Sequence, residues 1–209
     1  MKDVTVLYGT TIETMVPRLL EDLKPAKQIN RGAHVVIKPN LVVSRSSWQG
    51  VNTNPAVVEQ IVRYLKDHGI NTITVADGSG MGHSATEAFP LCGYDTMAKK
   101  YDVKLVDLER DDFEQRRPTI RGPFSKLQIA KTVADCDYLI NVPIMKAHRE
   151  TQITCSLKNM KGTMPRRMKT AFHGRDLDTA IAQLNSVVKP NFTLVDGTYG
   201  DLTSELGSN

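Results

Sequence analysis

The densest group of residues that could do chemistry follows a short apolar segment in the last third of the chain. Residues 138–142 read YLINV, which predicts a buried strand, and Pro143 ends it. The next thirty positions contain a single acidic residue, Glu150. Because Thr, Cys, Ser, Asn and Gly are interleaved with the charges, the segment indicates a shaped cationic site rather than a charged tail. Its nine basic and imidazole side chains are Lys146, His148, Arg149, Lys158, Lys161, Arg166, Arg167, Lys169 and His173.

Lys146 and His148 have the spacing in this segment that best suits catalysis. In an extended segment, residues two apart lie on the same side and can contact one bound group. Histidine exchanges protons near neutral pH, and a desolvated lysine among other cations has a lowered pKa that suits base or Schiff-base chemistry. We therefore expect Lys146 to be catalytic, His148 to be the general acid/base and His173 to be a second acid/base or a ligand. A histidine at the surface is the alternative for His148.

Three more predicted strands end in polar or glycine-rich turns. Residues 34–38 lead into Pro39-Asn40, residues 72–76 into the turn DGSGMG, and residues 192–195 into Asp196-Gly197. The glycine-rich turn could hold an oxyanion, although its spacing matches neither the dinucleotide fingerprint nor a P-loop. Because ligands of open α/β sheets bind outside the carboxyl ends of the strands, these turns should converge on one crevice. The expected ligand-binding residues are Lys38, Asn40, Asp77, Ser79, Lys158 and Asn159, with Arg149 as a further cation.

Metal and thiol chemistry are weaker possibilities. His173 could complete a divalent-metal site of mixed nitrogen and oxygen ligands with His148 and either Asp77 or Asp196, but the spacings match no standard zinc motif. Cys155 lies among cations that would lower a thiol pKa, yet no base partner is evident, so a buried structural cysteine is favoured. The three cysteines are Cys92, Cys136 and Cys155. Their odd number, their wide spacing and the absence of a C-x-x-C pair argue against a disulfide framework and against an all-cysteine zinc site.

Strand-like and helix-like segments alternate along the chain, which predicts an α/β fold. We expect a three-layer sandwich with a mostly parallel sheet, as a single domain over residues 1–209 or as two lobes. The last predicted strand lies close to the end of the chain, which suggests that the domain is truncated at its C-terminal end. Beyond the strands already given, we expect strands at 4–8 and 104–108, a hairpin near 118–122, a helical turn at 130–135, and helices at 11–23, 56–68, 84–89, 94–100, 151–158 and 177–188.

Composition narrows the class of partner. The 27 Lys and Arg residues against 23 Asp and Glu give a net charge of +4, which is low for a nucleic-acid binder. Aromatic residues are sparse around the basic segment, which also disfavours stacking on bases. No apolar run approaches the length of a membrane span, and no signal peptide is evident. The sequence therefore predicts a cytoplasmic protein with no membrane partner.

Five segments of the chain resemble the bacterial and archaeal domain-of-unknown-function family 362. The most specific pieces are Pro-x-x-Lys-x-His, which ends at His148, and Ser-Leu-Lys-Asn-x-x-Gly, which begins at Ser156. The resemblance implies that Lys146, His148, Lys158 and Asn159 are the core of the site, and it leaves Arg166, Arg167 and Lys169 in a mobile flap. The matching segments are IKPNLV (37–42), VADGSG (75–80), GYDTMAKKYDVKLVDL (93–108), INVPIMKAHRETQITCSLKNMKG (140–162) and FHGRDLDTAIAQLNSVVKPNFTLVDG (172–197).

The resemblance also bears on cofactors. Many members of the family carry a ferredoxin-like segment for two iron–sulfur clusters, but this chain lacks the C-x-x-C-x-x-C runs that such clusters need. An iron–sulfur cluster would therefore be bound outside this chain, on a ferredoxin-like domain or partner. The family architecture is also distantly similar to the nickel-dependent lactate racemase superfamily, in which a lysine and histidines serve a bound cofactor.

Together these observations predict an enzyme domain that binds a small anionic metabolite in a crevice lined by Lys and His. An iron–sulfur module outside this chain could couple it to redox chemistry. Two alternatives stay open: a non-catalytic scaffold associated with iron–sulfur electron transfer, and a nucleic-acid binder that uses the basic segment.

Overall fold

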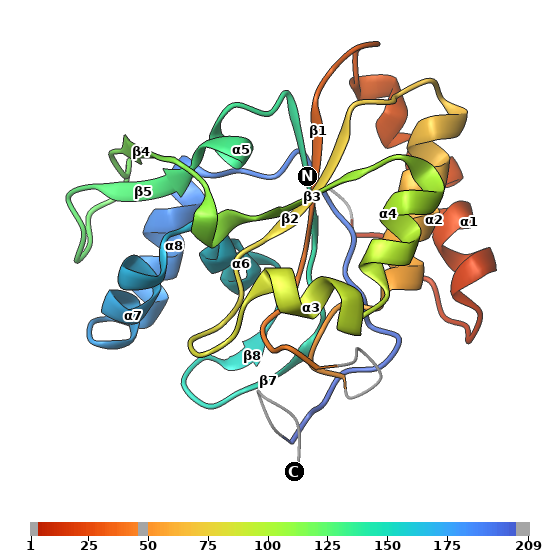
Figure 1. Ribbon diagram of the computed structural model, residues 1–209. Helices are drawn as coiled ribbons and strands as arrows, with labels where there is room; N and C mark the ends of the chain where they lie inside the picture. Colours follow the sequence, from red (N-terminus) through yellow and green to blue (C-terminus); the bar gives the residue numbers. More distant parts are fainter. Residues whose placement is uncertain (1–3, 46–49, 204–209) are drawn as a thin grey trace.

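A five-stranded parallel sheet forms the centre of the computed structural model, which describes residues 4–45 and 50–203 (Figure 1). The strand order is β3-β2-β1-β6-β9, and each neighbouring pair is parallel. The central strands are continuous apolar runs, as expected for strands that are covered on both faces. The strands are β1 (Val35–Pro39), β2 (Ile73–Asp77), β3 (Lys104–Asp107), β6 (Tyr138–Val142) and β9 (Phe192–Thr193).

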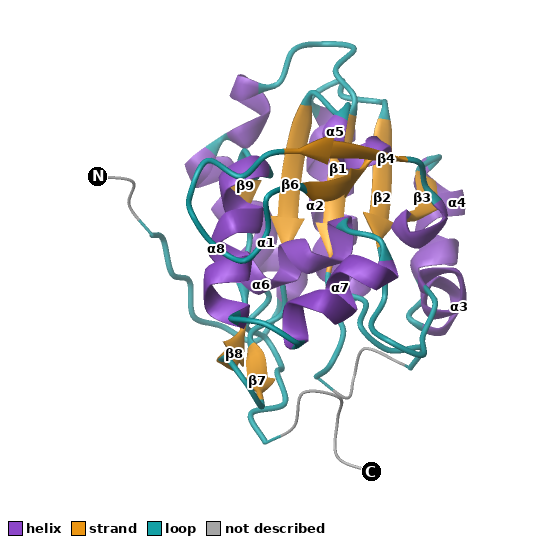
Figure 2. Ribbon diagram, turned by 90° about the vertical axis from the view of Figure 1, so that its left-hand side faces the viewer, coloured by secondary structure: helices purple, strands orange, loops and turns teal. Residues whose placement is uncertain are grey.

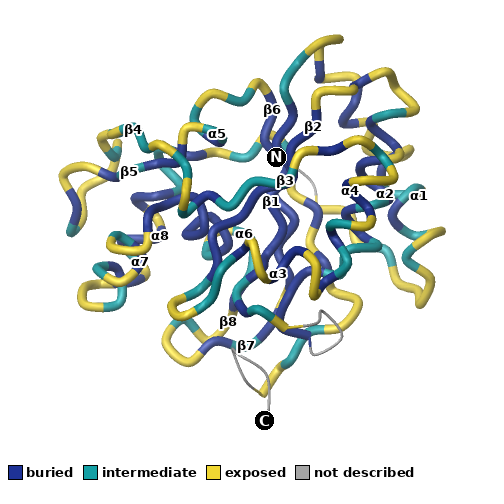
Figure 3. The backbone as a smooth tube through the Cα atoms, in the orientation of Figure 1, coloured by how far each residue is buried: buried dark blue, intermediate teal, exposed yellow. Residues whose placement is uncertain are grey.

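Helices cover both faces of the sheet, which confirms the expected three-layer α/β fold (Figures 1 and 3). Successive strand residues point to opposite faces, so Val35 and Ile37 pack into one core while Val36 packs into the other. The first core holds α1 (Ile12–Leu23), α2 (Pro55–Asp67), α3 (Ala85–Leu91) and α4 (Tyr94–Tyr101). The second holds α5 (Lys131–Ala134), α7 (Arg166–His173), α8 (Leu177–Val187) and the antiparallel hairpin of β4 (Phe113–Arg116) and β5 (Leu127–Ala130).

The carboxyl ends of the central strands share one edge of the molecule, toward the bottom of Figure 2. The small antiparallel hairpin of β7 (Lys146–His148) and β8 (Gln152–Thr154) lies beyond this edge. Residues 146–148 are therefore extended, as expected, and Lys146 and His148 lie on the same side of the strand. Two short helices, α6 (Ser156–Asn159) and the 3-10 helix η4 (Met160–Thr163), follow it. The loops at this edge are joined by hydrogen bonds, such as the one from the Thr53 hydroxyl to the Val142 carbonyl at 2.8 Å.

Three segments differ from the sequence-based expectation. Residues 4–8 form no strand; Val4 and Tyr8 are 87% and 90% exposed, because their β-forming side chains have no neighbouring strand to pair with. The helix expected at 151–158 is divided into β8 and α6, since Gln152 adopts φ +61° in the hairpin and Cys155 is extended. The basic segment expected as a flap contains α7, whose Phe172 is fully buried in the second core.

Candidate functional site

A cavity of about 390 Å³ lies at the carboxyl edge of the sheet. Its walls come from the end of β1, the turn after β2, the β7–β8 hairpin and the segment from α6 to α7. This volume is at the low end of the range for small-molecule sites. Nine of the ten residues predicted to bind or catalyse line it: Lys38, Asn40, Asp77, Ser79, Lys146, Arg149, Lys158, Asn159 and His173.

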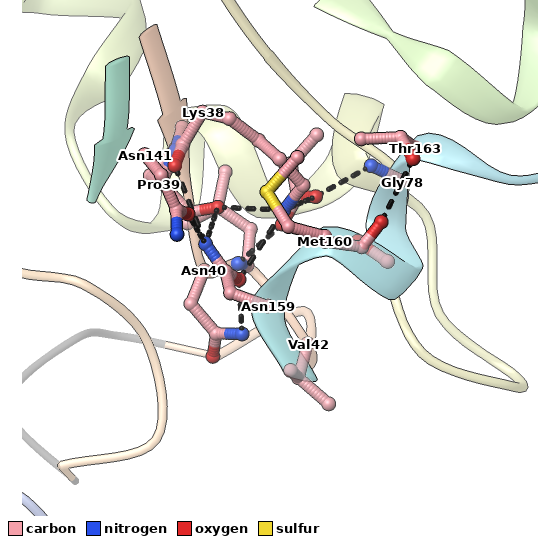
Figure 4. Close-up of polar contacts among 12 residues, drawn as sticks. Lys38, Pro39, Asn40, Val42, Gly78, Asn141, Asn159, Met160 and Thr163 are labelled. Carbon is pink, nitrogen blue, oxygen red and sulfur yellow. Dashed lines mark hydrogen bonds and ion pairs between the residues drawn. The ribbon is translucent and has the colours of Figure 1, made fainter. Parts of the chain in front are cut away.

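The floor of the cavity is a buried polar network (Figure 4). The Lys38 ammonium lies 2.6 Å from Asp77 Oδ1 and donates to Asn159 Oδ1 at 3.2 Å. Asn40 Nδ2 donates to the same oxygen at 2.8 Å, and Asn159 Nδ2 donates to Asn141 Oδ1 at 2.7 Å. Burial lowers the pKa of Lys38, while the Asp77 carboxylate opposes that shift. Because these side chains hold one another, they form a fixed base at the floor of the cavity.

The glycine-rich turn after β2 is shaped by close packing. A Cβ atom at Gly162 would lie 2.1 Å from Asp77 Oδ1, so a side chain at position 162 would displace the buried ion pair. Asp77 accepts hydrogen bonds from the backbone N–H groups of Leu41 at 2.7 Å and Gly78 at 2.8 Å. The Gly80 N–H donates to the Val42 carbonyl. These two turn N–H groups, at Gly78 and Gly80, are therefore already bonded to the protein and do not form the expected oxyanion cradle.

Lys146 and His148 lie on the same strand but have different surroundings. Lys146 is fully buried, lines the cavity and donates to the Val51 carbonyl at 2.7 Å. His148 is buried outside the cavity wall, with its ring centroid 6.3 Å from that of His173. Its Nδ1 atom accepts hydrogen bonds from the N–H groups of Glu150 and Thr151, both at 3.1 Å. The structure thus places His148 beneath His173, and the catalytic role of His148 stays a prediction.

His173 lines the cavity as the middle member of a chain of titratable groups. Its Nδ1 atom lies 3.0 Å from the Glu150 carboxylate, and its Nε2 atom lies 2.8 Å from Lys161 Nζ. A lysine ammonium can donate but not accept, so Nε2 is the accepting nitrogen and Nδ1–H donates to Glu150. This hydrogen bond is the main reason that the pKa of Glu150 is lowered. The arrangement orients His173 as carboxylates orient catalytic histidines, and sequence reasoning assigned no role to Glu150 or Lys161.

Helix α7 is anchored to the opposite side of the crevice. Lys169, which the resemblance places in a flap, is buried, donates to the Ser79 carbonyl at 2.6 Å and pairs with Glu109. Arg166 pairs with the same carboxylate at 2.6 Å, and Arg167 binds Gln128 at the surface. The flap expectation is therefore wrong for Lys169, which is part of the cavity wall.

Charge is concentrated in this cavity. Six cationic side chains line it against two lining carboxylates, Asp77 and Glu150, so the lining residues have an excess of four positive charges with the histidines neutral. One of the six, Lys169, also pairs with Glu109, which lies outside the lining. Opposite charges in a confined, weakly solvated site attract each other more strongly than in water. The arrangement is therefore complementary to a small anion. The six cations are Lys38, Lys146, Arg149, Lys158, Lys161 and Lys169.

The described residues do not fit a metal ion or an iron–sulfur cluster. Among them, no group of three or more His, Cys, Asp or Glu side chains is close enough to hold a metal. The Asp196 carboxylate, considered above as a ligand, accepts from the N–H of Asn54 at 2.9 Å and from Thr198. The three cysteines are free thiols, and burial raises the pKa of Cys136 to about 11, which suits a structural role. We therefore derive no chemistry through a resident metal.

Comparison with known proteins now places the chain. Residues 35–208 match the family described as Domain of unknown function (DUF362). The chain belongs to this family. It is also 25% identical over 175 residues to the thylakoid-associated protein sll1697 of Synechocystis sp., a match that covers 81% of this chain and 53% of that protein.

Among solved structures, the DUF362 chain is similar to the lactate racemase apoprotein from Thermoanaerobacterium thermosaccharolyticum. The TM-score is 0.58 at 16% identity, and the match covers 90% of this chain and 49% of that one. At this identity the likeness concerns the α/β fold alone. The chain spans about half the length of both relatives. None of the helices in the described ranges has both the length and the apolar character that crossing a bilayer requires.

Proposed function

We propose that this chain is an enzyme domain that binds a small anionic metabolite in the cavity at the carboxyl edge of its sheet. The observation that carries the proposal is the excess of four positive charges in a space of about 390 Å³. Lys146, Lys158 and Arg149 bind the negative charge, over the fixed base that Lys38 and Asn159 provide. Four of the six cations, Lys38, Lys146, Lys161 and Lys169, are buried. Burial of like charges close together opposes folding, so their presence favours a role in binding.

His173 supports acid–base chemistry in the same cavity. Its Nδ1–H donates to the Glu150 carboxylate, which would stabilise a charged ring. Its Nε2 atom now accepts from Lys161, so it can take a proton from a substrate only when the Lys161 ammonium moves away. His148, stacked beneath it, holds the hairpin turn that carries Glu150. We therefore assign proton transfer to His173 and include Lys146 and His148 as the further catalytic candidates.

Anion binding is tested by isothermal titration of the purified chain with inorganic phosphate and with small mono- and dicarboxylates. Lys158→Gln removes one cation from a partly exposed position, and we expect it to weaken binding about tenfold. Lys99→Gln makes the same change on the exposed surface of α4 and serves as the matched control. Equal affinities of both variants and the parent chain, or no binding of any anion, would contradict the proposal.

The redox link and the other functional classes have less support. The described residues offer no cysteine group for a cluster, so an iron–sulfur module would have to come from outside this chain. The cations line a small cavity rather than an extended stripe, which disfavours a nucleic-acid polymer. Metal analysis of the purified protein and mass spectrometry of the molecules that co-purify with it distinguish a metabolite-binding site from an iron–sulfur-linked role and from nucleic-acid binding. A cytoplasmic location stays a prediction.

A further inference from the structure

Three polar atoms in the cavity wall are buried without a hydrogen-bond partner among the described residues. They are Asn40 Oδ1, Ser79 Oγ and Thr154 Oγ1, and each belongs to a residue that lines the cavity. These three residues are at most 5% exposed. A buried polar atom without a partner is costly, so such atoms are rare in folded proteins. Three such atoms in one cationic cavity are positions at which a molecule bound in the cavity, water or ligand, can supply the missing partners.

The orientation of the Asn40 amide is fixed by the network around it. Asn141 Nδ2 donates to the Ser156 carbonyl, so Asn141 Oδ1 must accept from Asn159 Nδ2. Asn159 Oδ1 then accepts from Lys38 and from Asn40 Nδ2. Turning the Asn40 amide over would bring two oxygens together at 2.8 Å. Figure 4 shows the result: the nitrogen of Asn40 faces Asn159 and its oxygen points away from the network.

The unpartnered oxygen of Asn40 defines what the ligand must carry. An amide oxygen can only accept a hydrogen bond, so a ligand that satisfies it needs a donor as well as an anionic group. Ammonium and hydroxyl groups are both donors. An ammonium would be repelled by the excess of four positive charges in the same cavity, whereas a hydroxyl is neutral. The hydroxyls of Ser79 and Thr154 can donate to the anionic oxygens.

We propose that Asn40 selects a small anion that bears a hydroxyl group, because the hydroxyl donates to Asn40 Oδ1 while the lysines and the Ser79 and Thr154 hydroxyls bind the charged group. This inference rests on the proposed function, since it assumes that the cavity binds anions. It adds a chemical class of ligand, a hydroxylated carboxylate or phosphate, and a residue that determines specificity.

The test is a titration series in which charge is matched and the donor varies. Malate, succinate and aspartate share two carboxylates and carry a hydroxyl, a hydrogen or an ammonium group at the second carbon. Glycerol 3-phosphate and propyl phosphate form the corresponding phosphate pair. In at least one set, we expect the hydroxylated member to bind about tenfold more tightly than the unsubstituted member, and aspartate to bind more weakly than malate. The set whose members bind shows whether the anionic group of the ligand is a carboxylate or a phosphate.

Two variants test whether Asn40 Oδ1 is the atom responsible for the preference for a hydroxyl group. Asn40→Leu should remove the preference for the hydroxyl, so that the hydroxylated and unsubstituted anions bind alike, although both bind more weakly because the hydrogen bond from Asn40 to Asn159 is lost. Ser79→Ala should weaken all members and keep the preference. Thermal melting checks that each variant folds. If Asn40→Leu does not fold, the titration series on the parent chain alone decides whether the cavity prefers hydroxylated anions. Equal binding of hydroxylated and unsubstituted anions, or tighter binding of aspartate, overturns this inference alone. Failure of every anion to bind overturns the proposed function with it.

Discussion

Lys38 and Asp77 place opposite charges where solvent does not reach, with side chains 0% and 3% exposed. The desolvation cost of such a pair is offset by mutual attraction and by hydrogen bonds to the remaining polar atoms. Here Asn159 and the Pro39 carbonyl accept from the ammonium, and the N–H groups of Leu41 and Gly78 donate to the carboxylate. The pair therefore ties the ends of β1 and β2 to α6 and sets the floor of the cavity.

Removal of one member of this pair should be severe. Lys38→Met leaves the Asp77 carboxylate buried without its counter-charge, so we expect the free energy of unfolding to fall by about 3–5 kcal/mol, measured by urea denaturation. Lys100→Met is the matched control, because Lys100 pairs with Glu59 at 2.8 Å but is 61% exposed. The control should change stability little. A Lys38→Met protein as stable as the Lys100→Met protein would contradict a structural role for the buried pair.

At this scale the sequence predicts residue types better than their partners. Lys38, Asn40 and Asp77 could be placed at one sheet edge, because strand ends are visible as apolar runs that stop at polar residues. Their contacts with Asn159 depend on how α6 returns to the sheet, which no local pattern encodes. For His148, strand alternation predicts which face of the strand carries the side chain. It does not predict that the His173 ring would lie over the His148 ring.

Helix α7 is the element that sequence reasoning missed, and it forms one wall of the site. Its residues look like a charged surface segment, because Arg166, Arg167 and Lys169 interrupt the apolar pattern that marks a buried helix. Phe172 and the pairing with Glu109 nevertheless hold it against the fold. Glu109 is 60 residues away along the chain from Lys169, so the anchor is a tertiary contact that the sequence pattern does not reveal.

The Glu109 anchor can be tested without changing side-chain shape. Glu109→Gln removes the charge that Arg166 and Lys169 share, and we expect amide hydrogen exchange in α7 to accelerate about tenfold, equivalent to roughly 1.4 kcal/mol. Glu114→Gln, which breaks a pair with Arg116 on the β4–β5 hairpin, is the control. Unchanged exchange in α7 of the Glu109 variant would show that apolar packing alone holds the helix.

The charge of the whole molecule is distributed unevenly. The chain carries a net charge of +4, and the cavity wall alone has an excess of four positive charges. The remaining surface is therefore close to neutral overall. A positive cavity in an otherwise neutral molecule concentrates the electric field at its opening and raises the association rate of anions there. A basic stripe that binds a polymer would instead spread its charge over the surface.

This distribution predicts how salt changes binding. Raising the salt concentration from about 20 to about 500 mM shortens the Debye length to a few ångströms, and we expect the association rate of a dianion, measured by stopped-flow mixing, to fall about tenfold. Lys158→Gln should make this dependence shallower, because it removes charge from the cavity, whereas Lys99→Gln on the outer surface of α4 should leave it unchanged. An equal effect of both variants would mean that the field arises from the whole surface, and the salt dependence would then favour the polymer-binding alternative over a metabolite site.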